Sequence, residues 1–288
     1  MPDKNAYFDY LTKRLDSGES KNIVISTTVD IISKQLRSKK TTRVLDVGCF
    51  SGAMLNRINQ ELPSNFRDRV SYVGIDSDQD AMQHGSNKYG LITFVQTNLE
   101  KKINLVKQYD VIILCNVLHE LFPNEEIEIR RERIKSVFQG VSKLLNGEGE
   151  IILLDGIRPN DADKEIEIEL VNETWRKKFE KLVKEYTAAS LTLKNISKNK
   201  IKTNKFTLSV FLTKARYLDK EYWTSEAEQL YQYFSAKDFE GMINKSGLHV
   251  EEVTPQALEI EKATEMIIIS SLSEELPAKN VLIVAKNC

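Results

Sequence analysis

The chain has 288 residues, of which 41% are hydrophobic and 29% are charged, and its formal net charge at pH 7 is −1. This balance is typical of a globular protein with one large domain or a domain with a sizeable insertion, and a net charge near zero excludes a global field that recruits nucleic acid or membrane. No apolar run reaches the roughly 20 residues of a membrane helix, and the polar N-terminus lacks the apolar core of a signal peptide.

Cysteine and histidine usage points to a reducing compartment and to no metal site. The three cysteines, Cys49, Cys115 and Cys288, lie far apart and show no metal-ligand spacing. The three histidines are equally scattered along the chain. We therefore expect a cytoplasmic protein with no metal and no membrane partner; the sequence leaves its oligomeric state open.

Short apolar runs alternate with longer amphipathic segments between residues 23 and 155. The predicted strands are Arg43–Val47, Val70–Ile75, Ile92–Gln96, Asp110–Cys115 and Glu150–Asp155. The predicted helices are Ile23–Leu36, Ala53–Glu61, Ala81–Lys88 and Glu126–Leu145, and Asn146-Gly147 is expected to separate the last helix from its strand. Nearly continuous apolar strands that alternate with helices indicate an α/β fold with a doubly wound, mostly parallel sheet.

The alternation stops after Asp155, and we expect an insertion over 158–230. Within it the pattern predicts a helix over Glu165–Tyr186, followed by a Lys/Asn-rich stretch. Regular order then resumes with a helix over Ser235–Ser246, with Ser235 as its N-cap and Gly247 as its stop. The last two strands are expected at His249–Val253 and Val281–Ala285.

The segment VLDVGCFSG reads as a strand that runs into a tight glycine turn. Ligands of doubly wound folds bind outside the carboxyl ends of the strands, so Asp46, Gly48 and Gly52 should line a pocket. The glycines allow close approach of a ligand, and the Asp46 carboxylate can accept hydrogen bonds from a cationic or amine-bearing group. The dinucleotide fingerprint G-x-G-x-x-G requires glycine where this chain has Phe50 and Ala53, so an NAD site is disfavoured.

The next three strands also end in polar groups. Asp76 follows the second strand, where a carboxylate can bind the two hydroxyls of a ribose. Asn98 follows the third, where an amide could read an adenine edge. Asn116, His119 and Glu120 follow the fourth. Four successive strand ends thus suit a ligand that contains adenosine.

These motifs resemble the class I S-adenosylmethionine-dependent methyltransferase superfamily. VLDVGCFSG resembles its first motif, D-x-G-x-G-x-G, and YVGIDSD, QTNLE, YDVIILCNVLHEL and GEGEIILLDG resemble the motifs of the next four strands. FSAKDFEGMINKSGLHVEEV and VLIVAKN resemble the closing helix and antiparallel hairpin. The resemblance covers about 44–155 and 234–286. It does not cover the insertion. It implies a single methyltransferase domain, 1–288, with seven strands of which the last is antiparallel. From the position and composition of the insertion itself, we expect 158–230 to be a helical lid after the fifth strand.

The resemblance also implies a cofactor, S-adenosyl-L-methionine, and roles for individual residues. Carried over by position, the residues that bind the methionine moiety are Asp46, Gly48 and Gly52, and the residue that binds the ribose is Asp76. The adenine is bound by Asn98 and Leu99, and Asn116 lies near the sulfonium. Phe50 departs from the motif, and we expect its ring to pack beneath the turn or toward the lid. Such packing leaves the cofactor pocket open.

Several of these side chains also admit plainer interpretations. Asp76 could cap the following helix, and Asn98 could be an ordinary loop amide. His119 and Glu120 are candidates for a catalytic acid/base pair, or they could simply begin the next helix, since methyl transfer can proceed by positioning alone.

On the substrate side the candidates are Asp155, Arg158 and Tyr186. The insertion is locally basic, with 13 Lys/Arg against 4 Asp/Glu over 172–220, and aromatic residues interleave with the charges. Such a surface suits RNA or a nucleotide, or it is a solvated lid over a small molecule. We favour methyl transfer to a small-molecule acceptor; an RNA or nucleotide methyltransferase and a non-catalytic, cofactor-binding regulatory partner are the alternatives.

Overall fold

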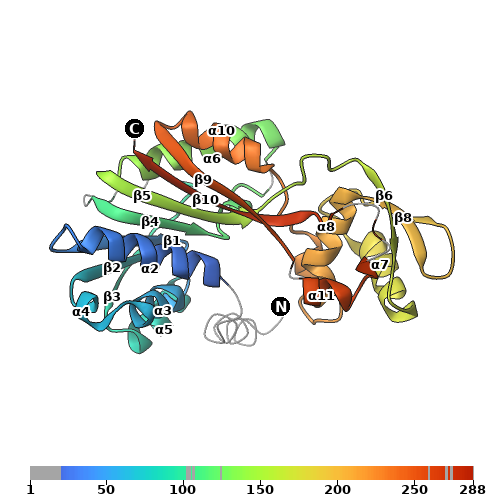
Figure 1. The fold of residues 1–288 in the computed structure, drawn as a ribbon, viewed down its shortest axis with the longest axis horizontal. Coiled ribbons are helices and arrows are strands. Elements are labelled where there is room, and N and C mark those ends of the chain that lie inside the picture. Colours follow the sequence, from blue (N-terminus) through green and yellow to red (C-terminus); the bar gives the residue numbers. More distant parts are fainter. Residues whose placement is uncertain are drawn as a thin grey trace. The chain divides into compact units, whose positions relative to one another are not determined.

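The computed structural model describes residues 21–287 except 102–104, 106–107, 124, 259, 270–271 and 273–274, so the N-terminal stretch and Cys288 lie outside it. The chain divides into two compact units (Figure 1). Of the described residues, the first comprises those within 21–155, 240–253 and 282–287, and the second comprises those within 156–239 and 254–281.

A seven-stranded sheet in the order β3-β2-β1-β4-β5-β10-β9 forms the centre of the fold. Its strands are Thr42–Val47 (β1), Val70–Asp76 (β2), Ile92–Gln96 (β3), Tyr109–Cys115 (β4), Leu145–Gly156 (β5), Leu248–Ala257 (β9) and Ala278–Asn287 (β10). β1 pairs in parallel with both β2 and β4, and β2–β3 and β4–β5 are also parallel. β10 runs antiparallel to the other six (Figure 1). The predicted fold class, including its antiparallel last strand, is confirmed.

The helices that accompany this sheet include the five predicted ones, each within three residues of its predicted bounds; Ser64–Arg67 and Leu118–Glu120 were not among the predicted helices. In chain order, the helices are Asn22–Leu36 (α2), Ala53–Glu61 (α3), Ser64–Arg67 (α4), Gln79–Lys88 (α5), Leu118–Glu120 (η1, a 3-10 helix), Ile127–Ser142 (α6) and Ala236–Asn244 (α10). Apolar side chains of α2 and α3, such as Ile32 and Ile58, join those of β1 and β4 in one buried cluster. This burial, which stabilises by about 25 cal/mol per Å² of apolar surface, covers one face of the sheet.

Two predicted helix ends and one predicted start can be compared with the structure. The Ser235 hydroxyl accepts from the Asp238 N–H at 3.2 Å, and Gly247 has φ +82°, so the predicted cap and stop of α10 are confirmed. The predicted end of α6 is wrong: the helix ends at Ser142, and Asn146-Gly147 lies inside β5. Leu145 already pairs with Tyr109, and a register shift in the β4–β5 ladder accommodates the residues that follow.

The second unit contains a small sheet and several helices. Its strands are Glu165–Glu169 (β6), Lys194–Asn195 (β7) and Lys200–Asn204 (β8), in the order β6-β8-β7, and its helices are Glu173–Glu185 (α7), Lys205–Lys214 (α8), Ala215–Tyr217 (η2, a 3-10 helix), Trp223–Ala227 (α9) and Ile260–Thr264 (α11).

The prediction of one helix over 165–186 is therefore wrong in its first third. Ile166 and Ile168 alternate with exposed or half-buried glutamates, which is the period of a strand, and both isoleucines are buried. The helix begins only after Asn172, whose side chain accepts from the Trp175 N–H. The assignment of 158–230 as a lid within one domain stays a prediction.

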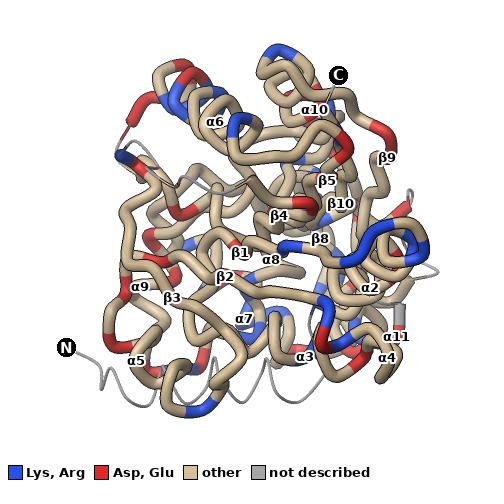
Figure 2. The backbone as a smooth tube through the Cα atoms, turned by 90° about the vertical axis from the view of Figure 1, so that its left-hand side faces the viewer, with Lys and Arg blue, Asp and Glu red and all other residues tan. Residues whose placement is uncertain are grey.

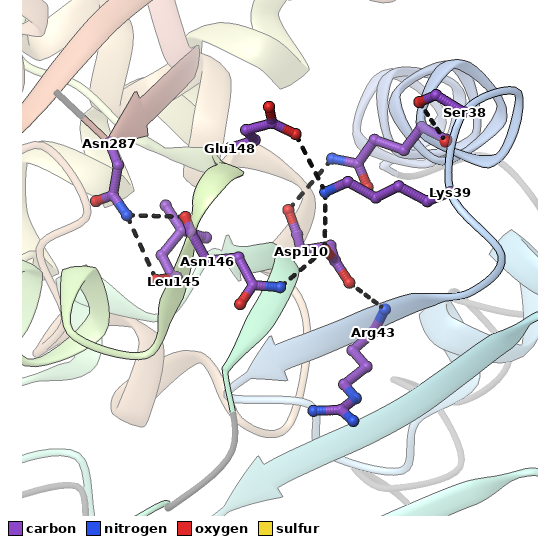
Figure 3. Close-up of polar contacts among 9 residues, drawn as sticks. Ser38, Lys39, Arg43, Asp110, Leu145, Asn146, Glu148 and Asn287 are labelled. Atoms are coloured by element: carbon purple, nitrogen blue, oxygen red, sulfur yellow. Dashed lines mark hydrogen bonds and ion pairs between the residues drawn. The ribbon is translucent and has the colours of Figure 1, made fainter.

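At the amino-terminal ends of the strands, the buried Asp110 carboxylate joins several elements (Figure 3). It accepts from the Arg43 N–H at 2.8 Å and the Asn146 amide at 2.8 Å, and it pairs with the Lys39 ammonium at 3.1 Å. Asn287, on β10, donates to the Asn146 carbonyl at 2.8 Å. The network thus ties β1, β4, β5 and β10 together at the edge away from the strand ends that carry the motifs.

We predict that Asp110→Asn lowers the free energy of unfolding by about 1.5–3 kcal/mol at pH 7, the scale of hydrogen bonds to a charged group. Burial alone would raise the pKa of Asp110, but the Arg43 N–H, the Asn146 amide and the Lys39 ammonium hold it below its usual value. A lowered pKa contributes stability that is present above the unfolded-state value and is lost in acid.

The difference from wild type should accordingly shrink below about pH 4. Denaturant titrations at pH 7 and pH 3.5 measure it, with the exposed Asp68→Asn as control. Equal stability of Asp110→Asn and wild type at pH 7 would contradict the prediction.

Candidate functional site

Asp46 lies next to the carboxyl end of β1 and is 1% exposed. Neither of its carboxylate oxygens has a hydrogen-bond partner among the described residues. Burial raises its pKa to about 7, the positive charge of Lys21 lowers it, and the negative charge of Asp76 raises it. A buried carboxylate with unused acceptors is matched to a cationic ligand group.

The turn after β1 is built from left-handed residues. Gly48, Phe50 and Gly52 have φ of +77°, +50° and +73°, respectively. A Cβ at Gly48 would lie 2.6 Å from the Val117 side chain, and one at Gly52 would lie 2.8 Å from the ring of Phe94. Both glycines are therefore required by backbone conformation and by close packing.

Phe50 adopts the backbone conformation of the glycine that the motif would have there. A left-handed non-glycine residue costs roughly 1–2 kcal/mol. The Phe50 N–H donates to Asp76 Oδ2 at 2.7 Å, which favours the conformation despite this cost. Its side chain is only half-buried, so Phe50→Gly should lose less than the about 3 kcal/mol expected for a fully buried ring.

Asp76, the last residue of β2, joins the turn to the second strand. Its Oδ2 accepts from the Phe50 N–H, and its Oδ1 accepts from the Asp78 N–H at 2.9 Å. The N-cap of α5 is Asp78, whose side chain accepts from the Ala81 N–H, so the capping role considered for Asp76 belongs to its neighbour. Each carboxylate oxygen has a second lone pair, and the half-buried Asp76 can still accept from ribose hydroxyls.

The third and fourth strand ends carry the remaining cofactor candidates. Asn98 is exposed, and its Oδ1 accepts from the Glu100 N–H at 2.8 Å, which leaves its amide NH₂ for a ligand. Leu99 is buried. Asn116 follows β4 with φ +55°, and its N–H donates to the Leu154 carbonyl at 2.7 Å. Their assignment to adenine and sulfonium stays a prediction.

His119 and Asp155, which the sequence nominated for different roles, form one pair. His119 Nδ1 lies 2.6 Å from Asp155 Oδ1, and Asp155 Oδ2 accepts from the Leu118 N–H at 2.8 Å. The Asp155 side chain is fully buried and that of His119 is 9% exposed. Glu120 is 66% exposed, and its Oε1 lies 3.9 Å from His119 Nε2. An orienting carboxylate behind an imidazole is the arrangement of a general base.

Arg158 and Tyr186 belong to the second unit. The Arg158 guanidinium stacks over Phe206 at 4.4 Å and lies 3.3 Å from Asp163. The buried Tyr186 hydroxyl donates to the Gln229 carbonyl at 2.9 Å, and burial raises its pKa. Both side chains have structural partners within their own unit, and their role toward a substrate stays a prediction.

Sequence reasoning missed Lys21, the residue before α2. Its positive charge acts on both the Asp46 carboxyl and the Cys115 thiol at the end of β4, and it lowers the pKa of each. No motif marks this lysine, because its place at the strand ends depends on how α2 packs. Among the described residues, no group of three His, Cys, Asp or Glu side chains is arranged to hold a metal ion.

Comparison with known proteins gives a domain match and a shared fold. Residues 45–151 match the model of a family described as "Methyltransferase domain". No curated protein matches the chain. None of the helices in the described part of the chain is both long and apolar enough to cross a membrane.

Three solved structures illustrate the structural likeness. An S-adenosylmethionine-dependent methyltransferase from Clostridium acetobutylicum ATCC 824 is 12% identical (TM-score 0.50; 99% of each chain covered). The plantazolicin methyltransferase BamL, in complex with a triazolic desmethylPZN analog and SAH, is 13% identical (TM-score 0.57; 100% of this chain and 92% of that one). An S-adenosylmethionine-dependent methyltransferase from Mesorhizobium loti is 13% identical (TM-score 0.51; 91% and 100%).

Residues 45–151 thus carry a methyltransferase domain, and the chain has the Rossmann-like α/β fold of S-adenosylmethionine-dependent methyltransferases such as those above.

We predict that Asp46→Asn stabilises the free protein at pH 8 while weakening cofactor binding. A raised folded-state pKa means that the native protein binds more protons than the unfolded chain between about pH 4 and pH 7, so stability from this group falls as pH rises through 7. The pKa of Asp46 is raised by about three units, which corresponds to about 4 kcal/mol of stability lost when the carboxylate ionises. We expect Asp46→Asn to raise the free energy of unfolding by only about 1–3 kcal/mol, because the new amide also lacks hydrogen-bond partners.

Thermal unfolding at pH 8 and calorimetry with S-adenosylmethionine measure the two effects. In the wild type, binding should weaken as pH falls below 7, because the ligand must then displace a proton from Asp46. A destabilised Asp46→Asn variant, or wild-type affinity that is constant from pH 8 to pH 5.5, would contradict this assignment.

Proposed function

We propose that this protein transfers the methyl group of S-adenosylmethionine to a small-molecule acceptor, and that the His119–Asp155 pair takes up the proton that the acceptor loses. The observation that carries the proposal is the 2.6 Å contact between His119 Nδ1 and Asp155 Oδ1 beside the strand ends that suit the cofactor.

The residues present fit the cofactor. The orphaned Asp46 carboxylate suits the cationic methionine moiety, with Gly48 and Gly52 shaping the turn around it. Asp76 accepts from the ribose hydroxyls. Three further residues complete the set, with Asn98 and Leu99 at the adenine and Asn116 toward the sulfonium. When bound, the cofactor supplies an electrophilic methyl group.

The His119–Asp155 pair determines which chemical groups are suitable methyl acceptors. The Asp155 carboxylate, anchored by the Leu118 N–H, holds the imidazole so that Nδ1 carries the proton and Nε2 is the basic nitrogen. His119 would then accept the proton that a hydroxyl or amine loses as it gains the methyl group, and the cofactor would leave as S-adenosylhomocysteine once its sulfur–methyl bond has broken. Asp155 stabilises the resulting imidazolium.

The paired lysines of the second unit favour a small molecule over RNA. Lys200 pairs with Glu167 at 2.9 Å and Lys202 pairs with Glu165 at 2.7 Å across the β6–β8 ladder. Lys205 pairs with Asp161 at 2.5 Å. The basic count over 172–220 omitted these acidic partners because they lie earlier in the chain, and Figure 2 shows Lys and Arg interspersed with Asp and Glu.

Two solved neighbours add support. BamL is described as a methyltransferase of plantazolicin, and another neighbour, the DszA carbon methyltransferase, is 15% identical with a TM-score of 0.50, with 91% of this chain and 52% of that chain covered.

The basic composition keeps RNA or a nucleotide as the second candidate. Transfer of labelled methyl groups into untreated, nuclease-treated and protease-treated extracts tests the proposal: label in the small-molecule fraction supports it.

Label that disappears after nuclease treatment would instead support the RNA alternative. No label in any fraction, together with intact cofactor binding, would favour a non-catalytic, regulatory protein.

We predict that His119→Gln lowers kcat by about 10²–10⁴-fold, the range of general-base catalysis, with the cofactor dissociation constant within twofold of wild type. Asp155→Asn should lower kcat and shift the pH–rate profile, because the imidazole loses its orienting charge. His249→Gln, at a 61% exposed side chain, is the matched control. Wild-type turnover by folded His119→Gln would show that positioning alone suffices.

We also predict that changing Lys198, Lys200, Lys202 and Lys205 to Ala leaves methyl transfer unchanged and causes little change in the salt dependence of any RNA binding. Three of these four charges are already paired with carboxylates. Binding of a 20-nucleotide RNA measured between 50 and 300 mM salt checks this. If the slope of the logarithm of the binding constant against the logarithm of salt concentration fell by about three to four units, the lysines would contact phosphates.

A further inference from the structure

We propose that Lys21 binds the α-carboxylate of the cofactor's methionine moiety. The inference deepens the proposed function and rests on the cofactor site assigned to the ends of β1 and β4. It adds the anion-binding group that this site otherwise lacks among the residues assigned above.

The backbone at Lys21 is unusual for a lysine. The residue has φ 71° and ψ 12°, the left-handed region, and its side chain does not cap the helix that follows. Its carbonyl accepts from the Ile25 N–H at 3.1 Å, so the conformation is fixed by the first turn of α2. A left-handed residue that is not glycine costs roughly 1–2 kcal/mol, and such strain is found where a side chain has a functional position.

The start of α2 lies toward the strand ends that carry the motifs, because Lys39, just beyond the other end of this helix, pairs with Asp110 at the opposite edge of the sheet. Cys115, the last residue of β4, is 4% exposed, and the positive charge of Lys21 acts on its thiol. Burial raises the pKa of Cys115 to about 11, so the thiol is neutral and does not compensate the ammonium charge. A thiol is also a weak acceptor, and an ammonium has three donors, so Lys21 can bind a further oxygen group.

The surroundings of Lys21 are otherwise acidic. Asp46 and Glu120 both experience its positive charge, while Asp76 and Asp155 add negative charge to the same strand ends. An anionic ligand group would be repelled by these carboxylates unless a cation lay beside it. Lys21 is a cation in that position.

The methionine moiety is a zwitterion and matches this pair of opposite charges. Its α-ammonium is complementary to the orphaned Asp46 carboxylate, and its α-carboxylate is complementary to the Lys21 ammonium. Asp46 and Lys21 stand on adjoining elements, β1 and the start of α2. One residue for each charge would fix the orientation of the amino-acid end of the cofactor.

The test compares ligands with and without the amino-acid end. S-adenosylhomocysteine carries the carboxylate, and 5′-methylthioadenosine lacks both the carboxylate and the ammonium. Decarboxylated S-adenosylmethionine lacks only the carboxylate. Calorimetry would give dissociation constants of the full-length wild type, Lys21→Met, Lys21→Arg and Lys34→Met, an exposed position on α2.

We expect Lys21→Met to weaken S-adenosylhomocysteine binding by about 10–100-fold, the scale of a charge-assisted hydrogen bond. Binding of 5′-methylthioadenosine and of the decarboxylated ligand should change less than twofold. Lys21→Arg should retain most of the affinity, and Lys34→Met should match wild type. Lys21→Gly suits φ 71° and should show the same ligand dependence without loss of stability.

An equal loss for all three ligands would overturn the proposal and make Lys21 a structural residue. Tighter binding of S-adenosylhomocysteine by Lys21→Met would also overturn it, because the lysine would then occupy the place of the ligand's own cation. Failure of the wild type to bind any of the three ligands would overturn the cofactor site itself, which separates that failure from the others.

Discussion

The buried carboxylate of Asp46 is the constraint on which the surrounding structure depends. It lies beside the end of the central strand β1, out of contact with water and with no hydrogen-bond partner in the described chain, so its ionisation is opposed by burial. A charge in this state lowers the stability of the free protein at neutral pH. The cationic ligand group proposed for this site would remove the penalty, and part of its affinity would then come from the instability of the empty protein.

The turn after β1 shows how a bulky residue is tolerated in a glycine motif. The turn needs alternate left-handed residues, and at Phe50 that conformation is maintained by a hydrogen bond from its N–H to Asp76. Asp76 therefore serves two strands, because it ends β2 and fixes the turn that leaves β1. The motif requires a left-handed backbone at this position, and glycine adopts that conformation at the lowest energetic cost.

Much of the fold could be predicted because β1–β5 are nearly continuous apolar runs separated by amphipathic helices. The helix predicted over 165–186 failed because β6 depends on pairing with β8, about 35 residues later, although the alternation of Ile166 and Ile168 was a local sign of a strand. His119 and Asp155 were both nominated as candidates from the sequence, but only the packing of β4 beside β5 shows that they are in contact. Lys21 had no local sign at all.

The order of the strands sets the separation between the proposed cofactor-binding residues and the His119–Asp155 pair. Chain order reverses between β1 and β4, so Asp46 and Asp76 fall on one side of the switch point while His119 and Asp155 fall on the other. Neighbouring strands lie about 4.8 Å apart, which places β1 and β5 roughly 10 Å from one another. Under the proposed function, a methyl donor held on the first side would meet an acceptor whose proton is removed on the second. The sheet itself sets this separation, so the two groups of residues need no direct contact to act on one reaction.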